Sequence, residues 1–401
     1  MPIAAATATA TTEALPMRIS YVTETWPPEL NGVSLTVERA VRYLRSRGHI
    51  VELIRPRQPG EARLDASDEL RTAGCVIPMY PDLRFGLARA ATLTRRFRQS
   101  RPDLVHLATP GPLCWAALAA AGTLGIATTS DFRTNFHQYS RHYGLGFLAG
   151  PVLGLLRRFH NLTRRTFVPT QASRRELAAA GFHKLSVVGR GVDTSRFTPA
   201  ARSAALRETW RAGPDAPVFL AVGRVAAEKN VELALRAFAN AKRVRPDARM
   251  VVVGDGPARA RLQAAHPDIH FAGVRRGDDL AAHYASADVF LFPSLSDTFG
   301  NVVMEALASG LPVVAFDCAA AAEHVANGQS GRLAVPGDEA GFMAATAALA
   351  VAPHSLQPMR DAAVAAARRA TWDEVLARFE SRLLETVDAP EASPARIPVV
   401  A

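Results

Sequence analysis

Short apolar runs of strand length alternate with helix-period segments along this chain of 401 residues, and the series starts twice. The first series of predicted strands covers Met17–Val22, His49–Ile54, Cys75–Ile77, Leu104–Leu107, Ala127–Ser130 and Arg165–Val168. The second covers Val218–Val222, Met250–Val253, Ile269–Phe271, Asp288–Phe292 and Pro312–Ala315. Alternating strands and helices form parallel sheets with helices on both faces. The pattern therefore predicts an α/β protein of two Rossmann-like, doubly wound domains that face each other across a cleft. Ligands are expected to bind in that cleft.

The chain is too long for a typical single domain, and Pro and Gly residues mark a break at about 193–217. We expect a disordered extension over 1–16, an N-terminal domain over 17–198 and a C-terminal domain over 199–370. A helix is predicted over 371–388, followed by a loose tail over 389–401. The first residues lack the basic and leucine-rich regions of a signal peptide, so Met17 is an alternative start.

Composition indicates a globular protein of a reducing compartment. Hydrophobic residues make up 48% of the chain, without an apolar run long enough to span a bilayer. The 3 cysteines are far apart and have no metal-site spacing. The net charge of +10 is spread along the chain, which disfavours nucleic acid and leaves a phosphorylated ligand, an anionic membrane or a plain solvated surface. We expect a cytoplasmic protein.

Two acids flank a predicted helix start in the segment Phe292–Ala315. Asp297 follows a strand, Phe299, Gly300 and Asn301 lie at the helix N-terminus, and Glu305 comes about 7 Å further along the axis. Unpaired backbone N–H groups at a helix N-terminus attract oxygen-rich, anionic ligands. This arrangement suits a ligand with hydroxyl groups spread over its length, and a sugar nucleotide is such a ligand.

Two cations follow the strand Val218–Val222, because Arg224 comes directly after Gly223 and Lys229 comes five residues later. Arginine binds two oxygens at once and lysine is a compact point charge, so the pair suits a diphosphate. The alternative is a solvated loop in which Glu228 pairs with its neighbours. Gly32, after the first strand, allows a close phosphate approach or simply makes the turn.

Three further segments leave alternatives open. The polar and aromatic loop Asp131–Tyr143 includes two candidate proton carriers, His137 and His142. The segment Leu145–Arg165 combines an apolar face with clustered arginines, which indicates either a membrane-surface helix or a helix packed in the first domain. The glycines of Val251–Pro257 do not complete a dinucleotide-binding fingerprint, and a tight turn is favoured.

Taken together, the motifs resemble the retaining glycosyltransferases of family GT4, which have the GT-B fold. The resemblance covers about 17–387, and Arg224 and Lys229 match the diphosphate-binding pair of that family. The E-x7-E motif of the family falls on Asp297 and Glu305. The resemblance implies that Glu305 holds the ribose and that Asp297 contacts the donor sugar.

The same resemblance assigns the remaining donor contacts. It implies that the backbone amides of Phe299, Gly300 and Asn301 bind the donor, that Gly32 belongs to a phosphate-contacting loop and that Val274 lies near the base. The opening T-E-T-W-P-P-E-L-N-G-V-S and the loop T-N-F-H-Q-Y-S-R-H-Y-G look most like the branch of α-mannosyltransferases and glycolipid glycosyltransferases.

Two positions depart from the family pattern. Asp297 stands where Glu is more usual, and Arg133 stands where the family commonly has His. An arginine cannot act as a base at neutral pH. If the reaction needs a neutral imidazole, the chain either is impaired or uses His137. If the backbone carbonyl or a positive charge suffices, Arg133 serves in catalysis with Arg224, Lys229 and Asp297.

The expected function is transfer of a hexose, mannose or glucose, from a nucleoside-diphosphate sugar to a hydroxyl of a lipid, lipid-linked or glycan acceptor. We expect no metal and no further cofactor, since the cations and helix N-termini would stabilise the leaving diphosphate. The membrane contact would be peripheral. The alternative is a catalytically impaired nucleotide-sugar-binding protein that supports a partner enzyme. A nicotinamide-dependent oxidoreductase is disfavoured by the missing third glycine.

Overall fold

The computed structural model describes residues 15–29, 32–58, 60–61, 68–77, 80–133, 149–297, 299–351 and 353–389. The chain divides into two compact units. The first contains the described residues up to Ser130 together with Leu162–Arg164 and those from Leu383 onward. The second contains the described residues of Asp131–Asn161 and Arg165–Arg382. The loop candidates His137 and His142 lie outside the described residues.

The strands of the first unit follow the order β4-β3-β2-β1-β5-β6. Their bounds are β1 (Arg18–Val22), β2 (Ile50–Pro56), β3 (Glu69–Ile77), β4 (Tyr80–Leu87), β5 (Leu104–Leu107) and β6 (Ala127–Asp131). Its helices are α1 (Gly32–Ser46), α2 (Ala90–Ser100) and α3 (Pro112–Leu124). Strand β1 pairs in parallel with β2 and β5, whereas β3 and β4 form an antiparallel pair that the sequence reading missed.

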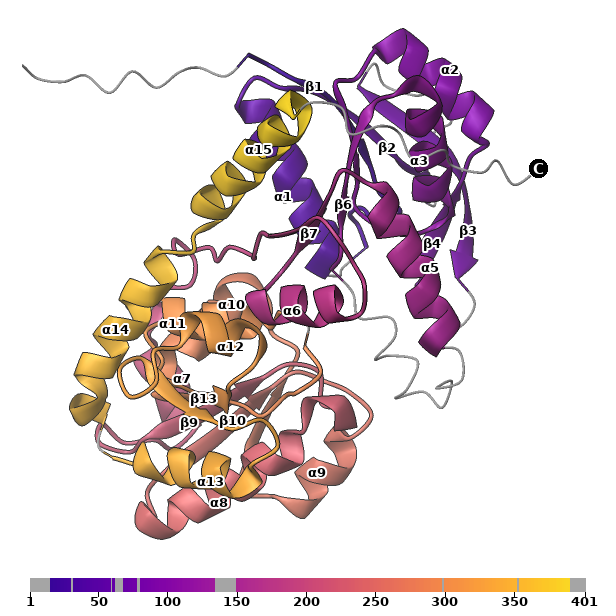
Figure 1. Ribbon diagram of the computed structural model, residues 1–401. Coiled ribbons are helices and arrows are strands. Elements are labelled where there is room, and N and C mark those ends of the chain that lie inside the picture. Colours follow the sequence, from indigo (N-terminus) through magenta and orange to yellow (C-terminus); the bar gives the residue numbers. More distant parts are fainter. Residues whose placement is uncertain are drawn as a thin grey trace, which may run out of the picture. The chain divides into compact units, whose positions relative to one another are not determined.

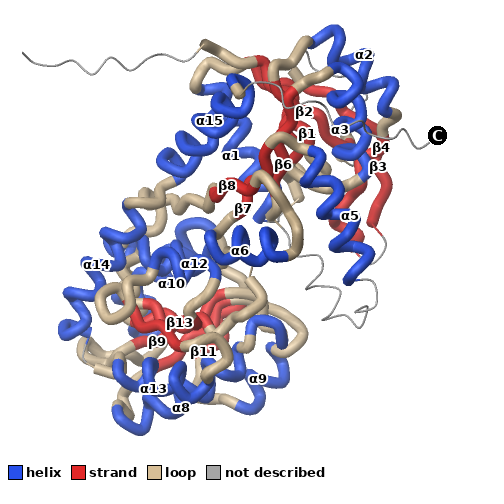
Figure 2. Tube along the Cα trace, in the orientation of Figure 1, coloured by secondary structure: helices blue, strands red, loops and turns tan. Residues whose placement is uncertain are grey.

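The second unit holds a parallel sheet with strand order β11-β10-β9-β12-β13-β14. Its strands are β9 (Val218–Val222), β10 (Arg249–Val253), β11 (His270–Gly273), β12 (Val289–Phe292), β13 (Val313–Phe316) and β14 (Gly331–Ala334). Strand β7 (Arg165–Val168) pairs in parallel with β8 (Leu185–Val187). Figure 1 labels these elements, and Figure 2 shows the strands of this sheet between two groups of helices.

The helices of the second unit, with its short 3-10 turns, complete the fold. They are α5 (Ala149–Leu162), α6 (Gln171–Ala179), η2 (Pro199–Ala201), α7 (Ala204–Thr209), η3 (Ala227–Lys229), α8 (Val231–Val244), α9 (Arg259–Ala265), α10 (Gly277–Ser286), α11 (Asn301–Ala308), α12 (Ala319–His324), α13 (Glu339–Ala348), η4 (Pro353–Leu356), α14 (Gln357–Arg368) and most of α15 (Trp372–Asp388). None of the described helices is long and apolar enough to cross a membrane.

Alternate residues of the central strands pack into two separate cores, because successive side chains of a strand point to opposite faces. Val218, Leu220 and Phe290 join one core, which also holds residues of α10, α11 and α14. Phe219 and Leu291 join the other, with residues of α8 and α13. Strands buried on both faces are continuously apolar, which explains why the sequence predicted them well. The expected α/β architecture with two parallel, Rossmann-like sheets is confirmed.

The segment between the two halves of the sequence is anchored by a buried carboxylate. Asp288, directly before β12, is fully buried and accepts hydrogen bonds from Arg207 at 2.8 Å and from Arg202 at 2.9 Å. Arg360 of α14 lies 3.5 Å from the same carboxylate. The residues around the predicted break are therefore held against the sheet that carries the site described next.

Candidate active site

The candidate site begins where β9 and β12 end. These two strands pair in parallel, so the loops that leave their carboxyl ends are neighbours. The first loop carries Gly223, Arg224 and the turn η3 that ends in Lys229, and the second runs from Pro293 to α11. A small hollow of about 20 Å³ lies between them, lined by Gly223, Arg224, Lys229, Phe292 and Pro293 among others.

The two loops are joined by an ion pair and a hydrogen bond. Lys229 Nζ lies 2.6 Å from Asp297 Oδ1, and both side chains are largely buried. Ser296 Oγ donates to the carbonyl oxygen of Glu228 at 2.9 Å. In the described part of the chain, Asp297 Oδ2 is buried without a hydrogen-bond partner. The structure thus brings together a cation and an acid that the sequence reading had placed in different motifs.

Arg224 is placed at the rim of the site. Its side chain is 54% exposed, and Nη1 lies 3.3 Å from Glu228 Oε1. Pairing with Glu228 was the alternative reading of this loop. Ion pairs this exposed contribute little to stability, because water screens them and holding the long side chain costs entropy. The guanidinium can therefore exchange Glu228 for an anionic ligand at small cost.

Gly300 opens the N-terminus of α11 in a conformation that favours glycine. Its φ is +90°, and a Cβ at this position would lie 3.0 Å from the ring of Phe292. Phe299 is buried and packs edge-on against His324, with ring centroids 5.9 Å apart. The buried phenyl ring fixes the loop, so that the N–H groups of the first turn of α11 lie next to Asp297.

Glu305, one turn into α11, is held by a residue that the sequence reading did not single out. Tyr284 Oη donates to Glu305 Oε2 at 2.9 Å. Burial raises the pKa of Glu305, while the bond from Tyr284 opposes that change. Tyr284 lies on α10, and its spacing from Glu305 gives no periodic signal in the sequence. Val274 follows β11 and is 56% exposed.

Arg133 follows β6 and is fixed by a buried ion pair. Its Nε donates to Asp131 Oδ2 at 2.6 Å, and the Arg133 side chain is 7% exposed. The position where the family pattern has histidine thus carries a cation bound to a carboxylate. Gly32 begins α1 in the first unit. The described residues contain no group of three or more His, Cys, Asp or Glu side chains arranged to hold a metal ion.

The glycine pair after β10 packs against residues 223–229, which we call the phosphate-site loop after its expected role, and this extends the predicted tight turn. Gly254 has φ +138°, and a Cβ there would overlap the carbonyl oxygen of Gly223. A Cβ on Gly256 would overlap the carbonyl oxygen of Val225. These glycines therefore let the loops after β9 and β10 lie in contact, which supports the position of Arg224.

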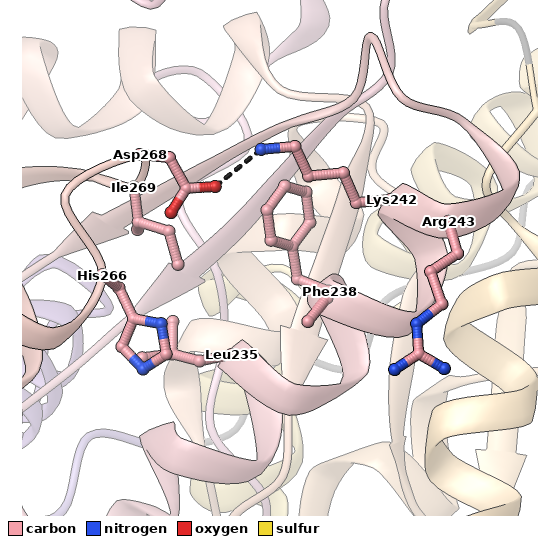
Figure 3. Close-up of a pocket in the computed structure, with 8 residues that line it drawn as sticks. Leu235, Phe238, Lys242, Arg243, His266, Asp268 and Ile269 are labelled. Atoms are coloured by element: carbon pink, nitrogen blue, oxygen red, sulfur yellow. Dashed lines mark hydrogen bonds and ion pairs between the residues drawn. The ribbon is translucent and has the colours of Figure 1, made fainter.

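A second hollow of about 250 Å³ lies away from these loops, between α8 and the residues before β11 (Figure 3). Lys242 extends over the ring of Phe238 at 5.9 Å and pairs with Asp268 at 2.6 Å. His266 and Ile269 lie on its other side. Lys242 and Asp268 in this hollow are thus paired with each other, as Lys229 and Asp297 are in the candidate site.

Comparison with known proteins identifies the family. Residues 30–196 match the family described as Glycosyltransferase Family 4, and residues 216–351 match Glycosyl transferases group 1. A GDP-mannose-dependent alpha-mannosyltransferase of Mycobacterium tuberculosis is 39% identical over 75% of this chain and 79% of its own length. The chain belongs to glycosyltransferase family 4. A second enzyme of the same name, from Mycolicibacterium smegmatis, is 35% identical over 92% of the chain and 98% of its own length.

Solved structures agree with the fold of this glycosyltransferase. A glycosyltransferase of Rickettsia africae superposes with a TM-score of 0.70 at 16% identity, covering 94% of this chain and 100% of that one. Anabaena HepE, solved with UDP and glucose, gives a TM-score of 0.66 over 92% of this chain and 99% of its own. The family and GT-B fold expected from the motifs are confirmed, and the oxidoreductase alternative is wrong.

Proposed function

We propose that this enzyme transfers a hexose from a nucleoside-diphosphate sugar to a hydroxyl of a lipid or glycan acceptor, with retention at the anomeric carbon. The observation that carries the proposal is the Lys229–Asp297 pair beside the N-terminus of α11. It would combine a phosphate-binding cation, a hydroxyl-binding acid and the backbone amides of a helix N-terminus within one loop pair. We infer GDP-mannose as the donor, since the relatives named above are GDP-mannose-dependent alpha-mannosyltransferases.

We infer the donor contacts from the motif residues. Arg224 and Lys229 would bind the diphosphate and stabilise the charge that develops as it leaves, without a metal ion. Asp297, with the amides of Phe299, Gly300 and Asn301, would hold the hexose. Glu305, which accepts a hydrogen bond from Tyr284, would bind the ribose, while Val274 would lie near the base and Gly32 near a phosphate.

Arg133 would act as a fixed positive charge close to the reacting sugar. Asp131 holds the Arg133 side chain in place through a buried ion pair. Because water screens a buried charge less than an exposed one, the guanidinium would interact more strongly with an anion that enters the site. Arg133 need not act as a base if the leaving diphosphate itself accepts the proton from the acceptor hydroxyl. Turnover by the unmodified enzyme would exclude the impaired, binding-only alternative.

The acceptor would be lipid-linked or glycan in nature. Among further relatives are the sulfoquinovosyl transferase of Arabidopsis thaliana, at 31% identity, and an alpha-monoglucosyldiacylglycerol synthase of Streptococcus pneumoniae, at 27%. Helix α5 exposes Leu155 and Arg158, which are three residues apart and so share one side, and this supports peripheral contact with anionic lipid. We also retain 17–198 and 199–370 as the two domains.

The deciding experiment is a donor and acceptor screen with the purified chain. We expect GDP-mannose to raise the melting temperature more than UDP-glucose, and GDP to be released when a lipid or glycan acceptor is added. EDTA should leave the rate unchanged, and NMR of the product should show an α-linkage. Stabilisation by none of the nucleotide sugars would reject the proposal.

A further inference from the structure

Arg190 places a buried guanidinium at the N-terminus of α11. It follows β8, and 9% of the residue is exposed. Its Nη1 lies 3.4 Å from Asn301 Oδ1, at the first residue of α11. The preceding Gly189 faces the ring of Phe299, which a Cβ would meet at 3.5 Å. The chain at 189–190 is therefore seated against the loop assigned to the donor.

Two buried polar atoms at this place have no hydrogen-bond partner in the described part of the chain. One is the donor Nε of Arg190, and the other is the acceptor Oδ2 of Asp297, whose Oδ1 binds Lys229. Burying charged groups with an unsatisfied donor or acceptor costs free energy. Such atoms are retained at functional sites when a ligand completes their bonding.

Arg190 and Asp297 belong to one electrostatic cluster. Burial and the nearby Arg133 lower the pKa of Arg190 to about 10, while Asp131 and Asp297 favour its charged form. It remains protonated at neutral pH. Asp297 and Asn301 lie on either side of Gly300, whose Cβ position is 3.9 Å from the Asp297 Cβ. Arg190 donates a hydrogen bond to Asn301 and is attracted electrostatically to Asp297.

The chemistry of the two unpartnered atoms identifies the group that fits them. Arg190 Nε–H can only donate, and an ionised Asp297 can only accept. A hydroxyl does both, since it accepts from Nε–H while donating its own proton to Oδ2. A phosphate oxygen has no proton to donate at neutral pH and would be repelled by the carboxylate.

We propose that Arg190 and Asp297 together bind one hydroxyl of the transferred hexose, so that Arg190 helps to determine which sugar is used. This assignment rests on the proposed function, and it adds a residue from outside the recognised donor motifs. A site that bonds a substrate hydroxyl discriminates strongly against an analogue without it, because the polar groups of the site are then left unpaired.

The test compares the dissociation constants of GDP-mannose and GDP, measured by calorimetry, for the wild type and for Arg190→Met and Arg190→Lys. A hydrogen bond to a charged group contributes about 1.5–3 kcal/mol, so Arg190→Met should weaken GDP-mannose binding by about 10- to 100-fold. GDP lacks the hexose, so its dissociation constant for Arg190→Met should stay within about twofold of the wild-type value. Arg190→Lys should recover part of the lost affinity for GDP-mannose. Arg196→Gln is the matched control, since Arg196 is on the same segment and makes an exposed pair with Asp278.

A deoxy-donor series keeps the test independent of variant stability. In the wild type, removal of one particular hydroxyl of GDP-mannose should weaken binding by tenfold or more. Arg190→Met should then bind that deoxy donor no more weakly than the wild type does. Equal weakening of GDP and GDP-mannose, or no hydroxyl coupled to Arg190, would overturn the assignment while leaving the proposed function in place. If the wild type binds no nucleotide sugar, both are rejected.

Discussion

Lys229 and Asp297 are 68 residues apart in the chain and form an ion pair of 2.6 Å between the loops that leave β9 and β12. The pair is side by side because the two strands are neighbours in the sheet. The two side chains are 25% and 18% exposed, so water screens their attraction only in part.

Loss of Lys229 should disable catalysis. Lys229→Ala removes the compact charge proposed to stabilise the leaving diphosphate, and we expect a fall in kcat/KM of about 10²–10³-fold. Steady-state release of the nucleoside diphosphate measures this. Lys242→Ala is the control, because Lys242 pairs with Asp268 outside the site. Near-normal turnover by Lys229→Ala would refute the assigned role.

Glu24 should make the stability of the first unit depend on pH. Its Oε1 accepts from the N–H of Leu113 at 2.8 Å, and burial raises its pKa from 4.5 to about 8. Between these values the folded chain keeps a proton that the unfolded chain has released, so stability falls as pH rises through this window. The slope is at most about 1.4 kcal/mol per pH unit.

Glu24→Gln removes the titration and keeps an oxygen that can accept the Leu113 N–H. We therefore expect the melting temperature of the variant, relative to the wild type, to rise steadily from pH 5 to pH 8. Melting curves at several pH values check this. A difference that does not change over that range would show that Glu24 does not titrate there.

Substitution of Gly254 should distort the phosphate-site loop. Gly254→Ala introduces a Cβ that overlaps the Gly223 carbonyl, in a backbone conformation that L-residues rarely adopt. We expect a loss of about 2 kcal/mol or more in stability and weaker GDP binding. Gly213→Ala is the matched control, since nothing lies within 4 Å of its Cβ position. Equal behaviour of the two variants would contradict this account.

Asp288 should be essential for stability rather than chemistry. Asp288→Asn leaves Arg202, Arg207 and Arg360 around a neutral group, and breaking a buried ion pair costs about 3–5 kcal/mol. Thermal unfolding should show a large loss, while Asp278→Asn, at a side chain that is 96% exposed, should show almost none. If the two variants melt alike, the anchoring role is wrong.

The sequence predicted the central strands well and the peripheral ones poorly. Leu104–Leu107, Arg165–Val168 and Val218–Val222 were predicted with the bounds observed, because each is a short run rich in buried apolar residues. Strand β4 was missed, since it contains Pro81, Asp82 and Gly86, which have low strand propensity. The short β8 and β14 gave too little pattern to detect.

The architecture, the family and the separate motifs could be predicted without a structure, because local periodicity and short motifs are properties of neighbouring residues. Which groups meet became clear from the fold. The pairing of Lys229 with Asp297, the bond from Tyr284 to Glu305 and the approach of Arg190 to α11 each join residues distant in the chain. Their contacts depend on strand order and on how loops pack, and no local pattern in the sequence encodes them.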